Sequence, residues 1–282
     1  MKQCPHMELE QKPSFFEQLI QASRKLELDH EGATTSAPES AAVVRAATAG
    51  FLEGYVAYNH INLETAVNSY METIRRYVRD IKAFLATGKY PLEIDPKQWD
   101  IGRTDYDLFL ILTILVTPHR CAIMEEISKV FPQGRCLVIG VGSGVELGFI
   151  NAPNGGDSYD LYINGYARQA FPQWSFHEEW YRPSDRRYSA VYAIELIEHL
   201  SEPYAFIADC HKSLAPGGLL VATTASDVPQ FDHRYNFVSD EDFEDRVRAL
   251  GFELELKRPI PHDYPRTDIK ARNAFYVFRR NV

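Results

Sequence analysis

The residues best suited to chemistry begin with three alternating glycines. They stand in Gly140-Val-Gly142-Ser-Gly144, directly after the apolar run Cys136–Ile139. Glycine lets the backbone turn tightly and lets a ligand come close to it, and a helix that begins there offers free N–H groups to a polar or anionic group. The pattern is typical of a loop that binds a nucleotide-like ligand, although the same spacing also occurs in plain turns.

An aspartate follows at a position where it can assist such a loop. Asp160 lies sixteen residues past Gly144, near the end of the strand-like run 158–163. A carboxylate at the end of a strand beside a glycine loop can accept hydrogen bonds from both hydroxyls of a ribose. A solvated loop aspartate is the alternative interpretation, and Asp157 is the less favoured substitute.

A second group of reactive side chains stands in Glu195-Leu-Ile-Glu198-His199, after the apolar run 188–195. We expect these two carboxylates and the imidazole to converge at the end of a strand. Histidine titrates near neutral pH and suits a general base that removes a proton from a hydroxyl or an amine. A structural histidine packed at the edge of a sheet is the alternative interpretation of His199.

The elements that position these groups alternate between strands and helices from residue 134 onward. Strand-like runs at 135–141, 158–163, 188–195 and 218–225 are interleaved with helical runs at 203–214 and 240–250. This alternation predicts a parallel sheet with right-handed crossovers, which is an α/β fold. Two closing strands, 252–258 and 274–280, have no helix between them and predict an antiparallel edge.

The part before residue 134 has a helical pattern instead. Apolar residues recur at three- and four-residue spacing between residues 41 and 88, and Gly88 suits a helix end. A helical patch at 14–28, a loop at 30–40, a loop at 90–105 and helices at 106–116 and 118–130 complete this part. The sequence therefore predicts two domains, a helical one over residues 1–130 and an α/β one over residues 131–282.

Composition limits the function classes. The net charge is −9 and there is no run of Lys and Arg, so nucleic acid is an unlikely partner and a small molecule is favoured. The four cysteines show no C-x-x-C spacing, which argues against a zinc or redox pair, and free thiols fit a reducing cytoplasm. There is no apolar signal segment, and the longest apolar stretch, 108–116, is too short to span a bilayer. We therefore expect a cytoplasmic protein without a membrane span.

Residues 134–280 resemble the class I S-adenosylmethionine-dependent methyltransferases. The resemblance lies in CLVIGVGSG, YDLYINGYARQAF, YSAVYAIELIEHLSEPYAFIADCHKSLAPGGLLVATT and GFELEL with AFYVFRR. The E-x-x-E-H-L pattern is similar to the branch that contains ubiquinone-biosynthesis O-methyltransferases. The resemblance implies a Rossmann-like, seven-stranded, mostly parallel sheet with an antiparallel last strand, preceded by an N-terminal helical cap.

The same resemblance implies where S-adenosylmethionine binds. The glycines would lie under its methionine and ribose, Asp160 would hold the ribose hydroxyls, Glu178 or Glu179 would approach the adenine, and Glu195 would lie beside the transferred methyl group. The expected cofactor-binding residues are Gly140, Gly142, Gly144, Asp160, Glu178, Glu179 and Glu195. One position departs from the family, because Val138 stands where an acid usually helps to hold the amino end of the methionine. That contact is expected to move to another group, such as one from the N-terminal segment.

A second resemblance concerns a metal ion. The E-x-x-E-H segment, together with Asp232-His-Arg-Tyr-Asn-Phe237, is similar to the small-RNA 3′-terminal 2′-O-methyltransferases. It implies a divalent cation held by Glu195, Glu198, His199 and His233. Carboxylates and imidazoles suit Mg, Mn, Fe or Zn, and such a cation would acidify an acceptor hydroxyl. The expected catalytic residues are accordingly His199, Glu195 and His233.

The leading hypothesis is methyl transfer to an oxygen or nitrogen nucleophile of an aromatic or moderately apolar small molecule, with His199 as the base. The alternatives are a metal-dependent RNA ribose 2′-O-methyltransferase and a protein that binds S-adenosylmethionine without methylating. A nicotinamide oxidoreductase is disfavoured, since the glycines run G-x-G-x-G instead of G-x-G-x-x-G.

The helices before residue 134 are expected either to cover the substrate pocket or to form a homodimer interface. Proposed substrate contacts from this segment are Tyr55, Tyr58, His60, Trp99, Tyr106, Asp107, His119 and Arg120.

Overall fold

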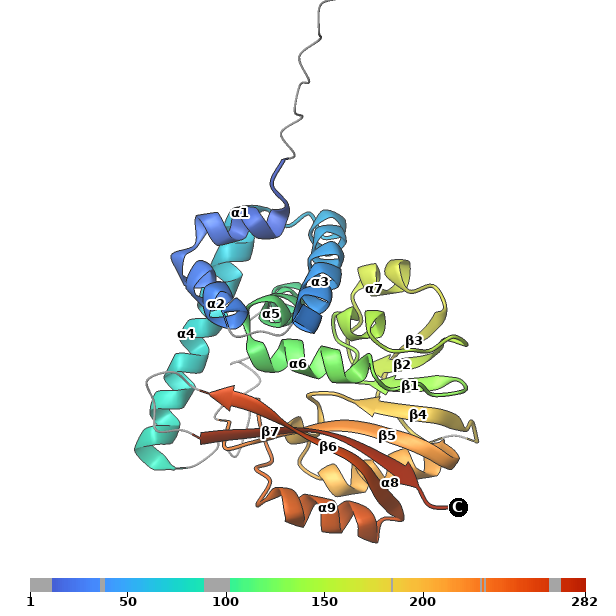
Figure 1. Cartoon of the computed structure of the whole chain (residues 1–282). Helices are drawn as coiled ribbons and strands as arrows, with labels where there is room; N and C mark the ends of the chain where they lie inside the picture. Colours follow the sequence, from blue (N-terminus) through green and yellow to red (C-terminus); the bar gives the residue numbers. More distant parts are fainter. Residues whose placement is uncertain are drawn as a thin grey trace, which may run out of the picture.

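Seven strands form one sheet in the order β3-β2-β1-β4-β5-β7-β6 (Figure 1). The computed structural model describes residues 12–35, 39–88, 102–183, 185–228, 230, 232–263 and 270–282. All pairs from β3 to β5 are parallel, and β7 runs antiparallel to both of its neighbours. The strands are β1 Cys136–Ile139, β2 Gly156–Asp160, β3 Trp174–Glu178, β4 Tyr188–Ala193, β5 Leu214–Ser226, β6 Phe252–Asp263 and β7 Lys270–Arg280. The predicted α/β class, the seven strands and the antiparallel last strand are confirmed.

Both faces of the sheet are apolar. Successive side chains of a strand point to opposite faces, and in the central strands both sets of side chains are apolar. In β1, Leu137 and Ile139 join a cluster with α8 and α9, whereas Cys136 and Val138 join a cluster with α5 and α6. Figure 1 shows α8 and α9 on the opposite side of the sheet from α6. Of these helices, α8 is Pro203–Ser213 and α9 is Asp240–Ala249. The other helical elements after β1 are short: α7 Gly165–Ala170 and the 3₁₀ turns η2 Val145–Gly148 and η3 Ile197–His199.

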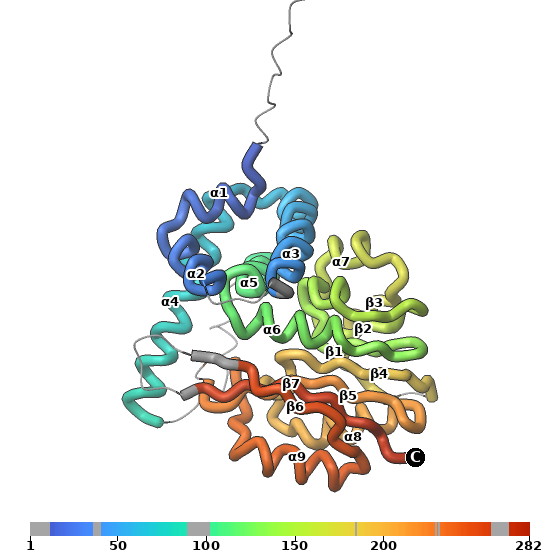
Figure 2. Tube along the Cα trace, in the orientation of Figure 1, coloured from blue at the N-terminus to red at the C-terminus, as the bar shows by residue number. Residues whose placement is uncertain are grey.

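The N-terminal helices gather around α5, as the trace in Figure 2 shows. Helix α5 is buried from Leu108 to Val116 except at the partly exposed Leu110, as expected of a helix that is apolar nearly all round. Helices α2, α3, α4 and α6 contact it. One apolar cluster joins these helices to the sheet. The helices are α1 Phe15–Ala22, α2 Arg24–Thr34, α3 Glu39–Tyr58, α4 Leu63–Thr87, α5 Arg103–Val116 and α6 Pro118–Ile127.

Two local predictions are wrong. The expected loop at 30–40 is helical as far as Thr34, because Leu26 and Ala33 give α2 a buried face. The helical run 41–88 is two helices, since the chain turns at His60 with a φ of 54° and Asn62 caps the new helix by accepting the N–H of Thr65 at 2.9 Å. Most of the expected loop at 90–105 lies outside the described residues, and its end forms the first turn of α5.

Cys121, Cys136 and Cys210 are buried and form no disulfide among the described residues. Within the described helices, none is long and apolar enough by itself to cross a membrane, and α5 and α6 meet that test only as a pair bent by 89°.

Candidate active site

A cavity of about 1680 Å³ opens at the carboxyl ends of β1, β2 and β4. Ligands of open parallel sheets bind at this edge, where the strand order reverses on either side of β1. One wall consists of the glycine loop and the ends of the strands, and the facing wall comes from helices α4, α5 and α6. The cavity therefore lies between the two parts of the chain that the sequence distinguishes.

The glycine loop adopts a backbone conformation that residues with a Cβ rarely adopt. Gly140, Gly142 and Gly144 all have positive φ, between 47° and 82°. A Cβ at Gly144 would lie 2.6 Å from the Cβ of Ala167, so this glycine lets the loop pack against α7. A Cβ at Gly142 would meet nothing nearer than the Oδ1 atom of Asp107 at 4.0 Å, so this glycine leaves open space beside the loop.

Asp160 is hydrogen-bonded to this loop. Its Oδ2 atom accepts the N–H of Gly142 at 2.8 Å, and its Oδ1 atom accepts the N–H of Tyr162 at 3.2 Å. Asp157 is fully buried lower in the same strand, where it pairs with Arg186 at 2.7 Å and does not line the cavity. The geometry therefore favours Asp160 over Asp157 as the ligand-binding carboxylate.

The two glutamates after the third strand differ in position. Glu178 ends β3 and pairs with Arg168 at 2.7 Å outside the cavity, whereas Glu179 lines the cavity. Trp180 and Tyr181 line it as well, and the sequence analysis did not single them out. Two aromatic residues directly after an acid at a strand end are the signal that would have identified them.

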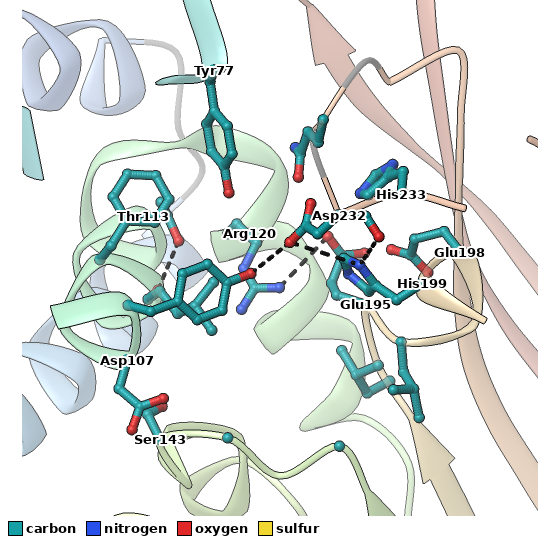
Figure 3. A pocket seen from close by; sticks show the side chains of 18 of the residues that line it. Tyr77, Asp107, Thr113, Arg120, Ser143, Glu195, Glu198, His199, Asp232 and His233 are labelled. Carbon is teal, nitrogen blue, oxygen red and sulfur yellow. Dashed lines mark hydrogen bonds and ion pairs between the residues drawn. The ribbon is translucent and has the colours of Figure 1, made fainter. Parts of the chain in front are cut away.

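Glu195 occupies the end of β4 in a strained conformation. Its φ is 49°, which a residue with a Cβ rarely adopts and which costs about 1–3 kcal/mol. The backbone N–H of Glu195 donates to Oγ1 of Thr223 at 2.7 Å. Its Oε2 atom lies 3.5 Å from Nη1 of Arg120. Figure 3 shows the side chains of Arg120 and Glu195 directed toward each other. This backbone carries the Glu195 side chain into the cavity, where it is among the lining residues.

Arg120 is a buried cation that forms ion pairs with two carboxylates of the site. Besides Glu195, it pairs with Glu146 of η2 at 3.2 Å. Burial raises the pKa of Glu146 above its ordinary value, and the guanidinium of Arg120 counteracts part of that effect. Sequence analysis named Arg120 as a contact but missed Glu146, although an acid two positions after Gly144 was visible in the sequence.

His199 is held through Nδ1. This atom lies 3.0 Å from the backbone oxygen of Asp232, and because a carbonyl oxygen only accepts, Nδ1 is the donor. In the neutral ring, Nε2 is then the acceptor. Burial alone would lower the pKa of His199, but the carboxylates of Asp232 and Glu198 outweigh it and raise that pKa. Asp232, which sequence analysis gave no role of its own, also accepts the hydroxyl of Tyr106 at 3.0 Å.

Glu198 is 1% exposed, and its Oε2 atom has no hydrogen-bond partner among the described residues. Burial, followed by repulsion from Glu195, raises the pKa of Glu198 to about 8. One ligand atom from each of Glu198, His199 and His233 lies within 4.8 Å of the others. The structure thus brings together three of the four expected metal ligands, and Glu195 is not part of that group.

The expected substrate contacts of the N-terminal segment divide into two sets. Tyr106, Asp107, His119 and Arg120 line the cavity. The others lie elsewhere or outside the described residues: Tyr55 donates to the backbone of Thr104, Tyr58 packs on Tyr166, His60 is an exposed turn residue, and Trp99 is not described.

The methyltransferase domain family matches residues 72–257, about two thirds of the chain. No curated protein matches it. An O-methyltransferase family protein from Burkholderia thailandensis is 14% identical, with a TM-score of 0.55 over 77% of this chain and 71% of that one. N-methyltransferase NodS from Bradyrhizobium japonicum WM9, in complex with S-adenosyl-L-homocysteine, is 16% identical, with a TM-score of 0.48 over 76% and 98%. The 1,6-didemethyltoxoflavin-N1-methyltransferase of Burkholderia thailandensis is 14% identical, with a TM-score of 0.47 over 57% and 79%.

The first of the solved structures shares the fold of this chain, and the expected ubiquinone-biosynthesis branch stays a prediction. Because the family match spans well over half of the chain and the sheet has the expected seven strands with an antiparallel last one, the chain belongs to the methyltransferase domain family, as a class I S-adenosylmethionine-dependent methyltransferase.

Proposed function

We propose that this enzyme methylates an oxygen or nitrogen atom of a small, largely apolar molecule. The observation that carries the proposal is the continuous cavity of about 1680 Å³, which extends from the glycine loop past Glu195 and His199 to apolar side chains of α4 and α5. Pockets for one small ligand are usually about 300–1,000 Å³. A cofactor and an acceptor therefore have room in the same cavity.

The glycine-loop end fits S-adenosylmethionine, whose sulfonium supplies an electrophilic methyl group. The backbone at Gly142 has open space beside it, so a ligand can approach closely. Asp160 accepts one backbone N–H at each oxygen, and each oxygen keeps a lone pair for a ribose hydroxyl. Glu179 and Trp180 lie where β3 ends and would bind the adenine. Glu195 would lie near the transferred methyl group.

The other end of the cavity is apolar. Helix α4 presents a stripe with three- and four-residue spacing, and α5 adds further apolar side chains: Ile74, Tyr77, Val78, Ile81, Phe109 and Leu110. Such a wall favours an aromatic or aliphatic acceptor and disfavours a charged polymer, in agreement with the net charge of −9. We accordingly propose residues 1–130 as the part that covers the acceptor and residues 131–282 as the part that binds the cofactor.

His199 is proposed as the general base. Its Nδ1 proton is used by the carbonyl of Asp232, so Nε2 of the neutral ring can take the proton of the acceptor as the acceptor atom bonds to the methyl carbon and the carbon–sulfur bond breaks. The Tyr106–Asp232 hydrogen bond holds the supporting segment in place. Base catalysis of this kind contributes about 10²–10⁴-fold, and positioning of the acceptor contributes the rest.

A metal-dependent reaction is the second candidate, and the grouping of Glu198, His199 and His233 favours it. The neutral imidazoles and the Glu198 carboxylate would hold a divalent cation, which would acidify an acceptor hydroxyl. An RNA ribose would be one such acceptor, although the acidic chain does not favour it.

The test is calorimetry with S-adenosylmethionine and S-adenosylhomocysteine, followed by methyl transfer from the radiolabelled cofactor to a panel of phenols, aromatic amines and short RNA. We expect both cofactor forms to bind, and label to appear in a phenol or amine without added metal. Loss of transfer in EDTA, restored by a divalent cation, would favour the second candidate. Binding without transfer to any acceptor would instead support a non-methylating role, and binding of neither form would contradict the assignment.

A further inference from the structure

Asp107 is a buried carboxylate that faces the glycine loop from the N-terminal segment. It lies in α5 and is 3% exposed. Its Oδ1 atom would be 4.0 Å from a Cβ placed on Gly142, and its Oδ2 atom has no hydrogen-bond partner among the described residues. Figure 3 shows the side chain directed toward the loop beside Ser143. Asp107 therefore lines the cavity with Oδ1 next to the open space at Gly142, and its buried Oδ2 is without a partner among the described residues.

The surroundings of Asp107 favour a cation. Burial raises the pKa of this carboxyl to about 8, and repulsion from Asp160 and Glu146 adds to the effect. The guanidinium of Arg103 and the hydroxyl of Tyr55 act in the opposite direction but do not cancel it. The buried guanidinium of Arg120 pairs instead with Glu146 and with Glu195. An ionised carboxylate that is buried without a full set of hydrogen-bond partners costs free energy, and a cation bound beside it reduces that cost.

The strand that leads into the loop contains no group for this purpose. Its four residues, Cys136–Ile139, are all apolar or thiol side chains and are all buried. Asp160 is already engaged by two backbone N–H groups. Among the described acids near the loop, Asp107 is the one with a buried oxygen that has no hydrogen-bond partner.

We propose that Asp107 binds the α-ammonium group of the cofactor's methionine moiety. The inference rests on the proposed function, since it needs S-adenosylmethionine at the glycine loop. The N–H donors of an ammonium group match a buried carboxylate that lines the cavity and lacks a full set of hydrogen-bond partners. Helix α5 thus supplies a cofactor contact from outside the sheet, and the N-terminal segment takes part in binding cofactor as well as acceptor.

Two ligands separate this contact from the rest of the cofactor site. S-adenosylhomocysteine keeps the ammonium, whereas 5′-deoxy-5′-methylthioadenosine has the same adenosine and thioether but no amino acid. We expect Asp107→Asn to weaken binding of S-adenosylhomocysteine by about 10–100-fold, the range for a charge-assisted hydrogen bond. Binding of methylthioadenosine should change less than about threefold. Asp105→Asn, in the same helix but outside the cavity lining, is the matched control and should alter neither.

Proton release gives a readout that needs no variant. Because a bound ammonium ionises Asp107, the wild-type protein should release close to one proton when S-adenosylhomocysteine binds at pH 7, measured by calorimetry in buffers of different ionisation enthalpy. Methylthioadenosine should release none. Equal weakening of both ligands by Asp107→Asn, no weakening of either, or equal proton release with both would overturn the inference while leaving cofactor binding intact. Failure of the wild type to bind either ligand would overturn the proposed function and the inference with it.

Discussion

The Nη1 atom of Arg120 lies 3.5 Å from the Oε2 atom of Glu195, so helix α6 reaches the end of strand β4. Through Glu146 at 3.2 Å, the same guanidinium also reaches the turn after the glycine loop. One buried cation thus joins the helical segment to the end of β4 and to the turn after the glycine loop. The helices before the sheet are therefore part of the site's electrostatics.

Replacing this cation should destabilise the fold. Arg120→Met keeps much of the side-chain volume but leaves Glu146 and Glu195 without their buried partner, and breaking such a pair costs about 3–5 kcal/mol. Urea unfolding at pH 7 measures the change. The control is Arg246→Met, since Arg246 pairs with Asp242 on the exposed face of α9 and should contribute less than about 1 kcal/mol. If both variants lose the same free energy of unfolding, the buried ion pairs of Arg120 contribute no more to stability than the exposed pair of Arg246.

Removal of the Asp160 carboxylate should weaken cofactor binding. Asp160→Ala loses the acceptor for the Gly142 N–H and for the ribose hydroxyls, and we expect about 1–3 kcal/mol, or roughly 5–150-fold, in the dissociation constant of S-adenosylhomocysteine. Calorimetry measures it. Glu178→Ala is the control, because Glu178 pairs with Arg168 outside the cavity. An unchanged dissociation constant for Asp160→Ala would remove this residue from the cofactor site.

His199→Gln tests the proposed base. Glutamine can still donate to the carbonyl of Asp232 but takes no proton at neutral pH, so kcat should fall by about 10²–10⁴-fold. The dissociation constant of S-adenosylhomocysteine should stay within about threefold. His211→Gln, on α8 against Phe252, controls for a loss of histidine elsewhere. A kcat within threefold of wild type would exclude His199 as the base.

The buried carboxyl of Asp107 makes stability depend on pH. Its pKa is raised to about 8 in the folded protein and is near 4 in an unfolded chain. Between these values the unfolded chain has released the proton and the folded protein still holds it. Stability without ligand should therefore fall as pH rises through this window, by at most about 1.4 kcal/mol per pH unit from this group.

Asp107→Asn should remove that dependence. Relative to wild type, the variant should gain stability between pH 5 and pH 8, as measured by urea unfolding at several pH values without cofactor. The Asp105→Asn variant serves again as the control, with a difference from wild type that varies less over the same range. A constant difference between Asp107→Asn and wild type would mean that Asp107 is already ionised at pH 5.

The local features of the cofactor loop were predictable because they depend on neighbours in the chain. The three glycines adopt the positive φ values that their spacing indicates, and Asp160 ends the strand beside them. The alternation of strands and helices predicted the sheet, and two adjacent strands without a helix predicted its antiparallel edge. Helix ends were predicted less well, as the turn at His60 shows, since tertiary packing decides where a long apolar pattern breaks.

The sequence by itself determined the class of the fold, the glycine loop with its positive φ values and the position of Asp160 at the end of the neighbouring strand. Only the tertiary structure decided that Glu179 and not Glu178 faces the cavity, that Arg120 lies between two acids, and that Asp107 faces the glycine loop across a gap of thirty-five positions in the chain. Backbone conformation follows from residues within a few positions, whereas the charge that a buried carboxylate meets depends on how separate helices pack. That packing results from the summed burial of apolar faces, which a pattern of residues does not place in space.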